Sequence, residues 1–369
     1  MIAAFGDEAL LRAALDFEAA LARAQAAGGL IPADAADVIT QVCASARFDT
    51  AELAEEAAHA GTLAIPLVSR LRALVAERNA AAAKLVHRGA TSQDVADTAL
   101  MLQAKAAAGL IVGATLTLTD VLAGLAQRHA ETPMIGRTLL QDALPITFGL
   151  RAANWLLGVD AALRRFEREA ADALVLQLGG ATGSLAGLDF AVVERVAADL
   201  GLGAPPMPWQ SRRDGVAGLA AALAILVGAI GKIARDVSLM AQGQVGEAFE
   251  PRIEGRGGSS AMTHKRNPTG CQVALSAAIR APGLAAAIFS GLPQEYERGL
   301  GGWQAEAPGL ALLFELAHGA LAAMTPVMEG LEVDAAAMQR NMDTAAIGSD
   351  VGESAALVRR ALAHYQNPR

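Results

Sequence analysis

Residues 257–268 read Gly-Gly-Ser-Ser-Ala-Met-Thr-His-Lys-Arg-Asn-Pro and indicate more about this chain than any other stretch. Two glycines, two adjacent hydroxyls and a cluster of cations stand close together in it. Such a loop can close over an anionic ligand, present an oxygen base and surround developing negative charge with donors. Gly-Gly-Ser-Ser alone would be read as an ordinary surface turn, since short motifs often match by chance. The full stretch predicts a loop that binds a carboxylate.

The composition around this loop predicts an all-α protein. Of 369 residues, 53% are hydrophobic, 18% are charged and only 4% are aromatic. Alanine and leucine, which favour helices, dominate the apolar content, whereas the residues that favour strands are comparatively scarce. Helical patterns alternate with breaks near residues 87–94, 133–145, 179–183 and 204–209. We expect long helices whose ends carry the chemistry.

The charge balance and the cysteines limit the partners and the compartment. A net charge of −8 does not favour broad attraction to nucleic acid or to an anionic membrane. Cys43 and Cys271 stand far apart without metal-ligand spacing, which fits a reducing cytoplasm and argues against a zinc site. The first eight residues lack the basic start and apolar block of a signal peptide. We therefore expect a cytoplasmic protein with no nucleic-acid partner.

Residues 215–231 carry no charge and raise the question of a membrane span. Their length only reaches the lower edge of the roughly 17–25 residues that a spanning helix needs. Alanine and glycine dominate the stretch, and a helix that is apolar all round is also required at the centre of a bundle. We expect a buried bundle helix here, and no membrane partner.

The break at residues 87–94 reads His-Arg-Gly-Ala-Thr-Ser-Gln-Asp. Thr91 and Asp94 have the spacing of a capping box, which predicts the start of a long helix. The hydroxyls of Thr91 and Ser92, together with free backbone N–H groups at that start, can hold a carboxylate. An ordinary helix cap is the alternative, and His87 taken alone would more often be structural than catalytic.

The break at residues 136–145 reads Gly-Arg-Thr-Leu-Leu-Gln-Asp-Ala-Leu-Pro. Arg137, Thr138 and Gln141 offer a guanidinium, a hydroxyl and an amide close together, and arginine suits bidentate recognition of a carboxylate. As isolated residues they would form a polar patch between helices.

Together, the three stretches resemble the conserved segments of the fumarase/aspartase superfamily, whose signature loop usually reads Gly-Ser-Ser-x-Met-Pro-x-Lys-x-Asn-Pro. Thr263 stands where that pattern has proline, and Asp142 stands near the position where adenylosuccinate lyases carry a catalytic histidine. The resemblance implies an elongated central helical bundle with smaller helical end regions. The domains implied are an N-terminal helical domain (1–95), a central long-helix bundle (96–330) and a C-terminal helical region (331–369) that is shortened. It also implies a homotetramer whose sites each take segments from three subunits.

Within the superfamily, residues 91–94, 264–268, 294–298 and 303–306 are most similar to the branch that closes carboxymuconates into lactones. This similarity implies a small tricarboxylate substrate and an enolate-like intermediate, with no metal or organic cofactor. The catalytic residues implied are Ser259 as the proton-transferring oxygen, Ser260 as its competitor, His87 as a proton carrier and Lys265 as an enolate stabiliser. The substrate-binding residues implied are Thr91, Ser92, Arg137, Thr138, Gln141, His264, Asn267 and Arg298, of which Asn267 also stabilises the enolate and His264 is a second possible proton carrier.

Two other interpretations stay open. The signature loop fits an adenylosuccinate lyase-like C–N lyase that releases fumarate equally well, although that enzyme needs a second histidine where this chain has Asp142. Thr263, Asp142 and the short C-terminal region also fit a catalytically silent structural homologue.

Overall fold

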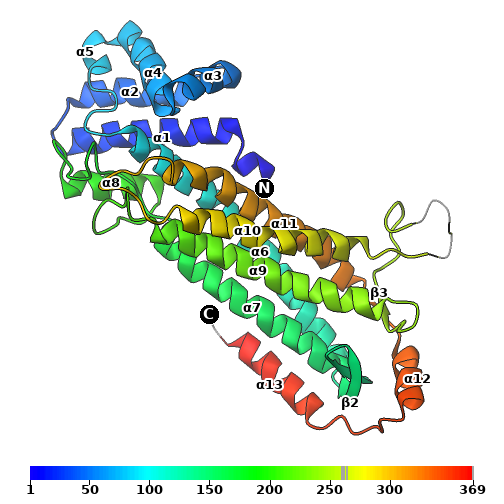
Figure 1. The fold of residues 1–369 in the computed structure, drawn as a ribbon. Helices are drawn as coiled ribbons and strands as arrows, with labels where there is room; N and C mark the ends of the chain where they lie inside the picture. Colours follow the sequence, from blue (N-terminus) through cyan, green and yellow to red (C-terminus); the bar gives the residue numbers. More distant parts are fainter. Residues whose placement is uncertain (259–261, 263–264, 368–369) are drawn as a thin grey trace. The chain divides into compact units, whose positions relative to one another are not determined.

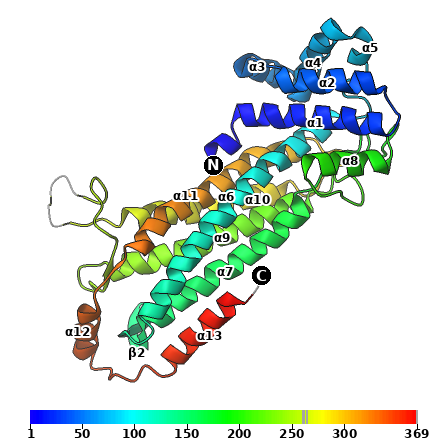
Figure 2. The ribbon, with the colours of Figure 1, turned by 180° about the vertical axis from the view of Figure 1, so that it is seen from behind.

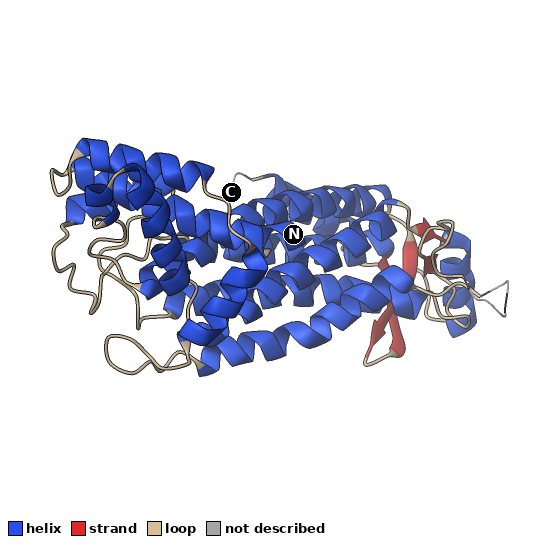
Figure 3. Ribbon diagram, turned by 90° about the horizontal axis from the view of Figure 1, so that it is seen from above, coloured by secondary structure: helices blue, strands red, loops and turns tan. Residues whose placement is uncertain are grey.

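Helices form most of the protein, as the composition predicts. The computed structural model describes residues 1–258, 262 and 265–367. Helices dominate the ribbon in Figure 1, and Figure 3 shows that strands are confined to short pairs. The expected all-α class is therefore confirmed.

The long helices occupy the alanine- and leucine-rich stretches of the chain. They are α6 (Ser92–Arg128), α7 (Phe148–Ala173), α9 (Asp214–Met240), α10 (Thr269–Ser290) and α11 (Glu306–Glu329). The shorter helices are α1 (Asp7–Ala27), α2 (Ala33–Ser45), α3 (Thr50–Ala60), α4 (Ala64–Arg78), α5 (Ala80–Ala83), α8 (Phe190–Leu200), α12 (Ala335–Ala345) and α13 (Ser354–Gln366), with 3-10 turns at Ile2–Ala4 and Trp303–Ala305. The strands are β1 (Pro133–Thr138), β2 (Gln141–Thr147), β3 (Ala248–Phe249) and β4 (Glu332–Val333), paired antiparallel as β1–β2 and β3–β4.

The chain packs as two compact units, each assembled from separate stretches of sequence. Unit 1 contains Met1–Gly109, Arg168–Leu219 and Ala286–Ala311. Unit 2 contains Leu110–Glu167, Ala220–Ala285 and Leu312–Arg369. Several long helices therefore contribute one part to each unit. The domain boundaries expected from the sequence stay a prediction.

Unit 1 is built on α1, which packs against both α2 and α8 (Figure 2). The side chains of Leu15, Phe17 and Leu21 on α1 are buried in this core, as are Ile39 of α2 and Val196 of α8. Alanines occupy many of the remaining core positions, so the helices can approach closely.

Unit 2 holds most of α7, α9, α10 and α11. Phe166 of α7 and Phe314 of α11 meet edge to face, with ring centroids 6.1 Å apart. An added Cβ at Gly231 of α9 would lie 2.6 Å from the Cβ of Ala278 on α10, so this pair of helices needs glycine at the contact. At one end of the unit, α12 packs against β1 and α13 against β2.

Four described helices are long and apolar enough to cross a membrane, by length and composition only. They differ in how much of the apolar window lies inside the protein: 61% in α9 but only 28% in α10. The charge-free stretch at residues 215–231 lies in α9, where Leu223, Leu226 and Ile230 are fully buried. That stretch is thus packed as a bundle helix.

Candidate active site

The first predicted segment lies at the start of α6, where Asp94 organises the surrounding loops. Its carboxylate accepts hydrogen bonds from the backbone N–H groups of Thr91 at 3.0 Å, Gly179 at 3.0 Å and Gly180 at 2.9 Å. The Nε2 atom of Gln177 donates a further bond at 3.0 Å. Asp94 therefore caps α6, as the Thr91–Asp94 spacing predicts, and also fastens the glycine-rich break at residues 179–183 to that helix start.

The environment of Asp94 changes its titration. Burial raises the pKa of Asp94 to about 6, although hydrogen bonds from Gln177 and from three backbone N–H groups act in the opposite direction. Its carboxylate is fully buried. The fully accepting, ionised form of this anchor is therefore the main one only above about pH 6.

Arg298 lies beside Thr91 in space, although the two residues are far apart in the sequence. One guanidinium nitrogen of Arg298 donates to the Thr91 hydroxyl at 2.7 Å and to the Ala181 carbonyl at 3.0 Å. Its Nε atom is buried and has no hydrogen-bond partner among the described residues. Ser92 is the first residue of α6, so its backbone N–H lies among the free donors of that helix end. Unit 1 thus gathers a hydroxyl, a guanidinium and a helix start, which together suit a carboxylate.

A buried ion cluster lies one turn further along α6. Arg213 donates to Asp97 at 2.8 and 2.9 Å and to Glu306 at 2.6 and 3.1 Å, and all three side chains are at most 3% exposed. The guanidinium also lies 4.6 Å from the centre of the Trp209 ring. Burial raises the pKa of both carboxylic acids, although their ion pairs with Arg213 act in the opposite direction. Gln93 links the cluster to the helix start through a 3.1 Å bond to Asp97.

The predicted residue His87 is held from behind by a carboxylate. Its Nδ1 atom lies 2.6 Å from Oε1 of Glu18 on α1. Sequence reasoning did not find Glu18, Asp97, Arg213 or Glu306. A signal was present for Glu18, because it stands on the apolar face of α1 between Ala14 and Ala22, where a lone carboxylate is unusual.

The second predicted segment forms the hairpin β1–β2 of unit 2. Thr138 pairs with Gln141 across the tip, and Arg137 pairs with Asp142. The two turn residues, Leu139 and Leu140, have φ angles of 53° and 66° and are 95% and 75% exposed. Positive φ at both central positions is what a tight hairpin turn requires, although glycine and asparagine usually supply it. The tip thus presents Thr138 and Gln141 beside two exposed leucines.

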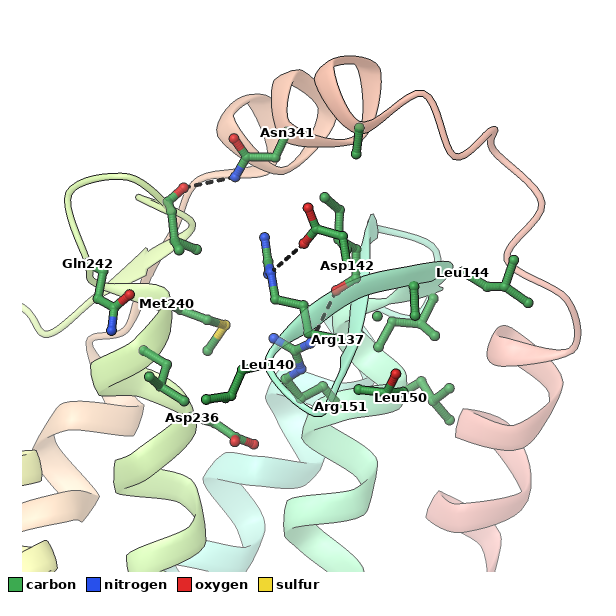
Figure 4. Close-up of a pocket in the computed structure, with 18 of the residues that line it drawn as sticks. Arg137, Leu140, Asp142, Leu144, Leu150, Arg151, Asp236, Met240, Gln242 and Asn341 are labelled. Carbon is green, nitrogen blue, oxygen red and sulfur yellow. Dashed lines mark hydrogen bonds and ion pairs between the residues drawn. The ribbon is translucent and has the colours of Figure 1, made fainter.

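Arg137 is tied down within unit 2 by carboxylates. Its two terminal nitrogens donate to Glu247 at 2.7 and 2.8 Å, and its Nε atom donates to Asp142 at 3.2 Å. Glu247 is fully buried and accepts a further bond from Asn341 at 2.8 Å. Arg137, Asp142 and Asn341 line a hollow with a volume of about 1360 Å³. Figure 4 shows these three side chains around it. In this arrangement the guanidinium fastens the hairpin to the strand region at residue 247.

The third predicted segment is described in part. Ser259, Ser260, Thr263 and His264 lie outside the described residues. Lys265 is exposed, and Asn267 donates from Nδ2 to the Gly258 carbonyl at 3.3 Å. The backbone of Asn267 donates to Gly257 at 2.8 Å and closes the loop.

This loop is fastened on both sides of its base. Gly257 has a φ of 73°, and an added Cβ would lie 2.7 Å from the Asn267 carbonyl, so only glycine fits there. Arg266 binds Glu332 at 2.9 Å and lies 5.1 Å from the centre of the Phe249 ring. The loop base and the hairpin are thus both attached near residues 247–250.

The predicted site residues therefore divide between the two units. His87, Thr91, Ser92 and Arg298 belong to unit 1, whereas Arg137, Thr138, Gln141, Lys265 and Asn267 belong to unit 2. Within unit 1 the structure brings Thr91 and Arg298 together, and within unit 2 it anchors the hairpin and the loop base to neighbouring residues.

Other chemistry at the described residues is limited. No group of three or more His, Cys, Asp or Glu side chains suited to a metal ion occurs in the described part of the chain. Burial raises the pKa of Cys43 to about 12 and raises that of Cys271 as well, so neither buried thiol is a ready nucleophile at neutral pH.

Comparison with known proteins identifies the family of this chain. Residues 1–283 match the sequence profile of the lyase family. The chain belongs to this lyase family. The resemblance to the fumarase/aspartase superfamily is thereby confirmed.

Individual relatives show which enzymes of the family this chain is similar to. The chain is 51% identical over 346 residues to the 3-carboxy-cis,cis-muconate cycloisomerase of Bradyrhizobium diazoefficiens, covering 93% of this chain and 77% of the relative. It is 42% identical over 367 residues to the nitrosuccinate lyase of Streptomyces davaonensis, covering 96% and 77%. The crystal structure of the 3-carboxy-cis,cis-muconate lactonizing enzyme from Pseudomonas putida superposes with a TM-score of 0.86 at 40% identity, covering 98% of this chain and 84% of that one.

Proposed function

We propose that this lyase-family enzyme is a 3-carboxy-cis,cis-muconate cycloisomerase that acts in protocatechuate and other aromatic degradation. The observation that carries the proposal is the 51% identity, over nearly the whole chain, to an enzyme of that name. The carboxylate-binding arrangement of Thr91, Ser92 and Arg298 supports it, since the substrate is a tricarboxylate.

The reaction is an isomerisation that needs no second reactant. One substrate carboxylate adds across a double bond and forms the C–O bond of the lactone, while a proton is added at the carbon next to another carboxylate. The product is 4-carboxymuconolactone. The intermediate is an aci-carboxylate, an enolate that carries extra negative charge. Donors whose bonds strengthen as that charge grows lower the barrier, whereas donors that bind substrate and transition state equally do not.

The side chains divide the work as follows. Thr91, Ser92 and Arg298 hold substrate carboxylates at the start of α6. Arg137, Thr138 and Gln141 supply further donors for the carboxylates from the hairpin, where Glu247 holds the Arg137 guanidinium in place. Lys265 and Asn267 stabilise the enolate. Ser259 transfers the proton, with Ser260 as its competitor, His87 and His264 as possible proton carriers, and no metal or organic cofactor taking part.

The enzyme works as a homotetramer whose sites combine segments from different subunits. Exposed apolar side chains on α10 support this, since Val273 is 51% exposed and Ile279 74% exposed. The exposed leucines at the hairpin tip support it too, because a tip with two exposed leucines at positive φ is suited to contact with another chain. The buried free cysteines fit a reducing compartment such as the cytoplasm.

The test is direct. The purified oligomer is incubated with 3-carboxy-cis,cis-muconate, and the loss of the diene absorbance is followed together with formation of the lactone. Catalysed loss is expected, and both Ser259→Ala and Lys265→Ala should abolish it while the oligomer stays intact. No loss at any enzyme concentration would refute the assignment, and retained activity in either variant would refute that residue's role.

A second candidate is a C–N lyase, which the 42% identity to a nitrosuccinate lyase favours. Nitrosuccinate and adenylosuccinate, tested beside carboxymuconate, separate the two functions. An intact oligomer that turns over none of these acids would instead indicate a catalytically silent homologue.

A further inference from the structure

Glu18 is a charged residue in an otherwise apolar environment. It lies on α1 among buried alanines and leucines of the unit 1 core, and its side chain is 1% exposed. Burying a carboxylate is costly unless it is paired or hydrogen-bonded. Its only described partner is His87, whose Nδ1 atom lies 2.6 Å from Oε1, while Oε2 is buried without a hydrogen-bond partner among the described residues. Core packing alone does not explain this residue.

His87 is held in an uncommon backbone conformation at the other end of the same contact. Its φ angle is 62°, in the left-handed region that residues with a side chain rarely adopt. The neighbouring residue, Arg88, is fixed to α1 and the turn after it, since its carbonyl accepts from Gln25 at 2.6 Å and its guanidinium donates to Leu30 at 2.7 Å. The histidine is therefore held in its strained conformation against α1, directly in front of Glu18.

The contact decides which ring nitrogen is free. An ionised carboxylate only accepts hydrogen bonds, so the Nδ1 atom of His87 must carry the proton that joins it to Glu18. The Nε2 atom has no hydrogen-bond partner among the described residues, and the side chain keeps 14% of its surface exposed. His87 precedes Thr91 by four residues, at the same helix start where Arg298 binds.

We propose that Glu18 is a positioning residue: it holds His87 with Nδ1 protonated and leaves Nε2 as the nitrogen that carries a proton during turnover. The inference rests on the proposed cycloisomerase function. Glu18 itself does not touch the substrate. It acts in the way that a buried carboxylate orients a catalytic histidine in other enzymes.

Glu18→Gln is the matched substitution, because glutamine keeps the shape of the side chain. Its amide can either accept a hydrogen bond from Nδ1 or donate one to it, so it no longer fixes the proton on Nδ1. The kcat for 3-carboxy-cis,cis-muconate should fall by about 10²-fold or more, while KM changes by less than about threefold. Asp16→Asn is the control on the same helix: the Asp16 carboxylate is half exposed and pairs with Arg12 at 2.8 Å, so activity should stay within about twofold. Glu18→Asp, which keeps the charge but shortens the reach, should lose less activity than Glu18→Gln.

A second readout does not depend on activity. The six histidines are labelled with ¹⁵N, and the His87 signals are identified by their loss in His87→Gln. At a pH of about 8.5, well above the ordinary histidine pKa, Nδ1 of His87 should carry a proton in the wild-type protein and lose this preference in Glu18→Gln. An unprotonated Nδ1 in the wild type overturns the inference, and so does an active wild type whose Glu18→Gln variant keeps its kcat. An inactive wild type would refute the proposed function, and this inference with it.

Discussion

Replacing Arg213 with methionine should destabilise the protein strongly, and the loss should depend on pH. The substitution removes the guanidinium that two buried carboxylates share, Asp97 and Glu306, whose side chains are 3% and 1% exposed. Breaking a buried ion pair by removing one partner costs about 3–5 kcal/mol. Methionine has a similar length and is flexible, so little of the loss should come from a cavity. We expect the free energy of unfolding to fall by about 4 kcal/mol at pH 7.5.

The dependence on pH distinguishes this cause from a packing defect. Without Arg213, the folded-state pKa of the two carboxylic acids lies further above the unfolded value. Their favourable contribution is present at low pH and is lost as the pH rises through the folded-state pKa. The loss measured at pH 7.5 should therefore shrink at pH 5.5, by up to about 1.4 kcal/mol per pH unit for each carboxylate that takes up a proton.

The measurement is urea unfolding followed by circular dichroism at one fixed protein concentration, since the stability of an oligomer depends on concentration. Arg70→Met is the matched control, because Arg70 also bridges two carboxylates, Glu52 and Glu56, which are 64% and 45% exposed. The control should lose far less stability than Arg213→Met, because its carboxylates are solvated. A loss below about 1 kcal/mol in Arg213→Met, or an equal loss at both pH values, would show that the cluster is not the buried, coupled system described above.

Three further changes test other parts of the account. Burial raises the pKa of Asp94 to about 6, so its contribution to stability is full below about pH 4 and is lost as the pH rises through 6. Unfolding titrations should therefore show the wild type losing about 3 kcal/mol of stability relative to Asp94→Asn between pH 4 and 7. Parallel stability curves for the two proteins would contradict this. Arg298→Met should lower kcat/KM by about 10- to 100-fold, because a hydrogen bond to a charged group contributes about 1.5–3 kcal/mol, and steady-state kinetics within twofold of wild type would exclude Arg298 from binding. Gly257→Ala should lower turnover at least about tenfold, since its Cβ would meet the Asn267 carbonyl. Gly255→Ala is the control: its φ is also positive but the space around it is open, so it should lose less turnover. Equal losses of turnover in the two variants would exclude the clash as the cause.

The helices could be predicted from the sequence because their signals are local. The breaks expected near residues 87–94, 133–145 and 204–209 come shortly before the long helices α6, α7 and α9. The start of a long helix that the Thr91–Asp94 spacing predicts is the start of α6 at Ser92. Capping residues and glycines act within a turn of the helix end, so a single sequence reveals them.

The hairpin at residues 133–147 could be predicted only as an interruption. Its strands are fixed by pairing with each other and by contacts with α12 and α13, which lie far along the chain. Its turn also lacks the usual signal, because Leu139 and Leu140 occupy positions where glycine or asparagine would indicate a tight turn.

The buried charges were the main omission from the predicted site. Arg213 reaches Asp97 across 116 positions of sequence and Glu306 across 93 positions. Glu18 reaches His87 across 69 positions. Pairing over such distances depends on the tertiary fold, whereas the family motifs point only to residues expected to contact the substrate.

The most direct test of the central claim is complementation between two inactive chains. Thr91→Val and Lys265→Ala variants, carrying different tags, are co-expressed, and mixed oligomers are isolated and assayed with 3-carboxy-cis,cis-muconate beside the wild-type enzyme. If each site takes these two segments from different subunits, about one site in four of a random mixture regains both intact residues. Mixed oligomers of two inactive parents should therefore show about a quarter of wild-type activity. Mixed oligomers no more active than either parent, beside an active wild type, would contradict it.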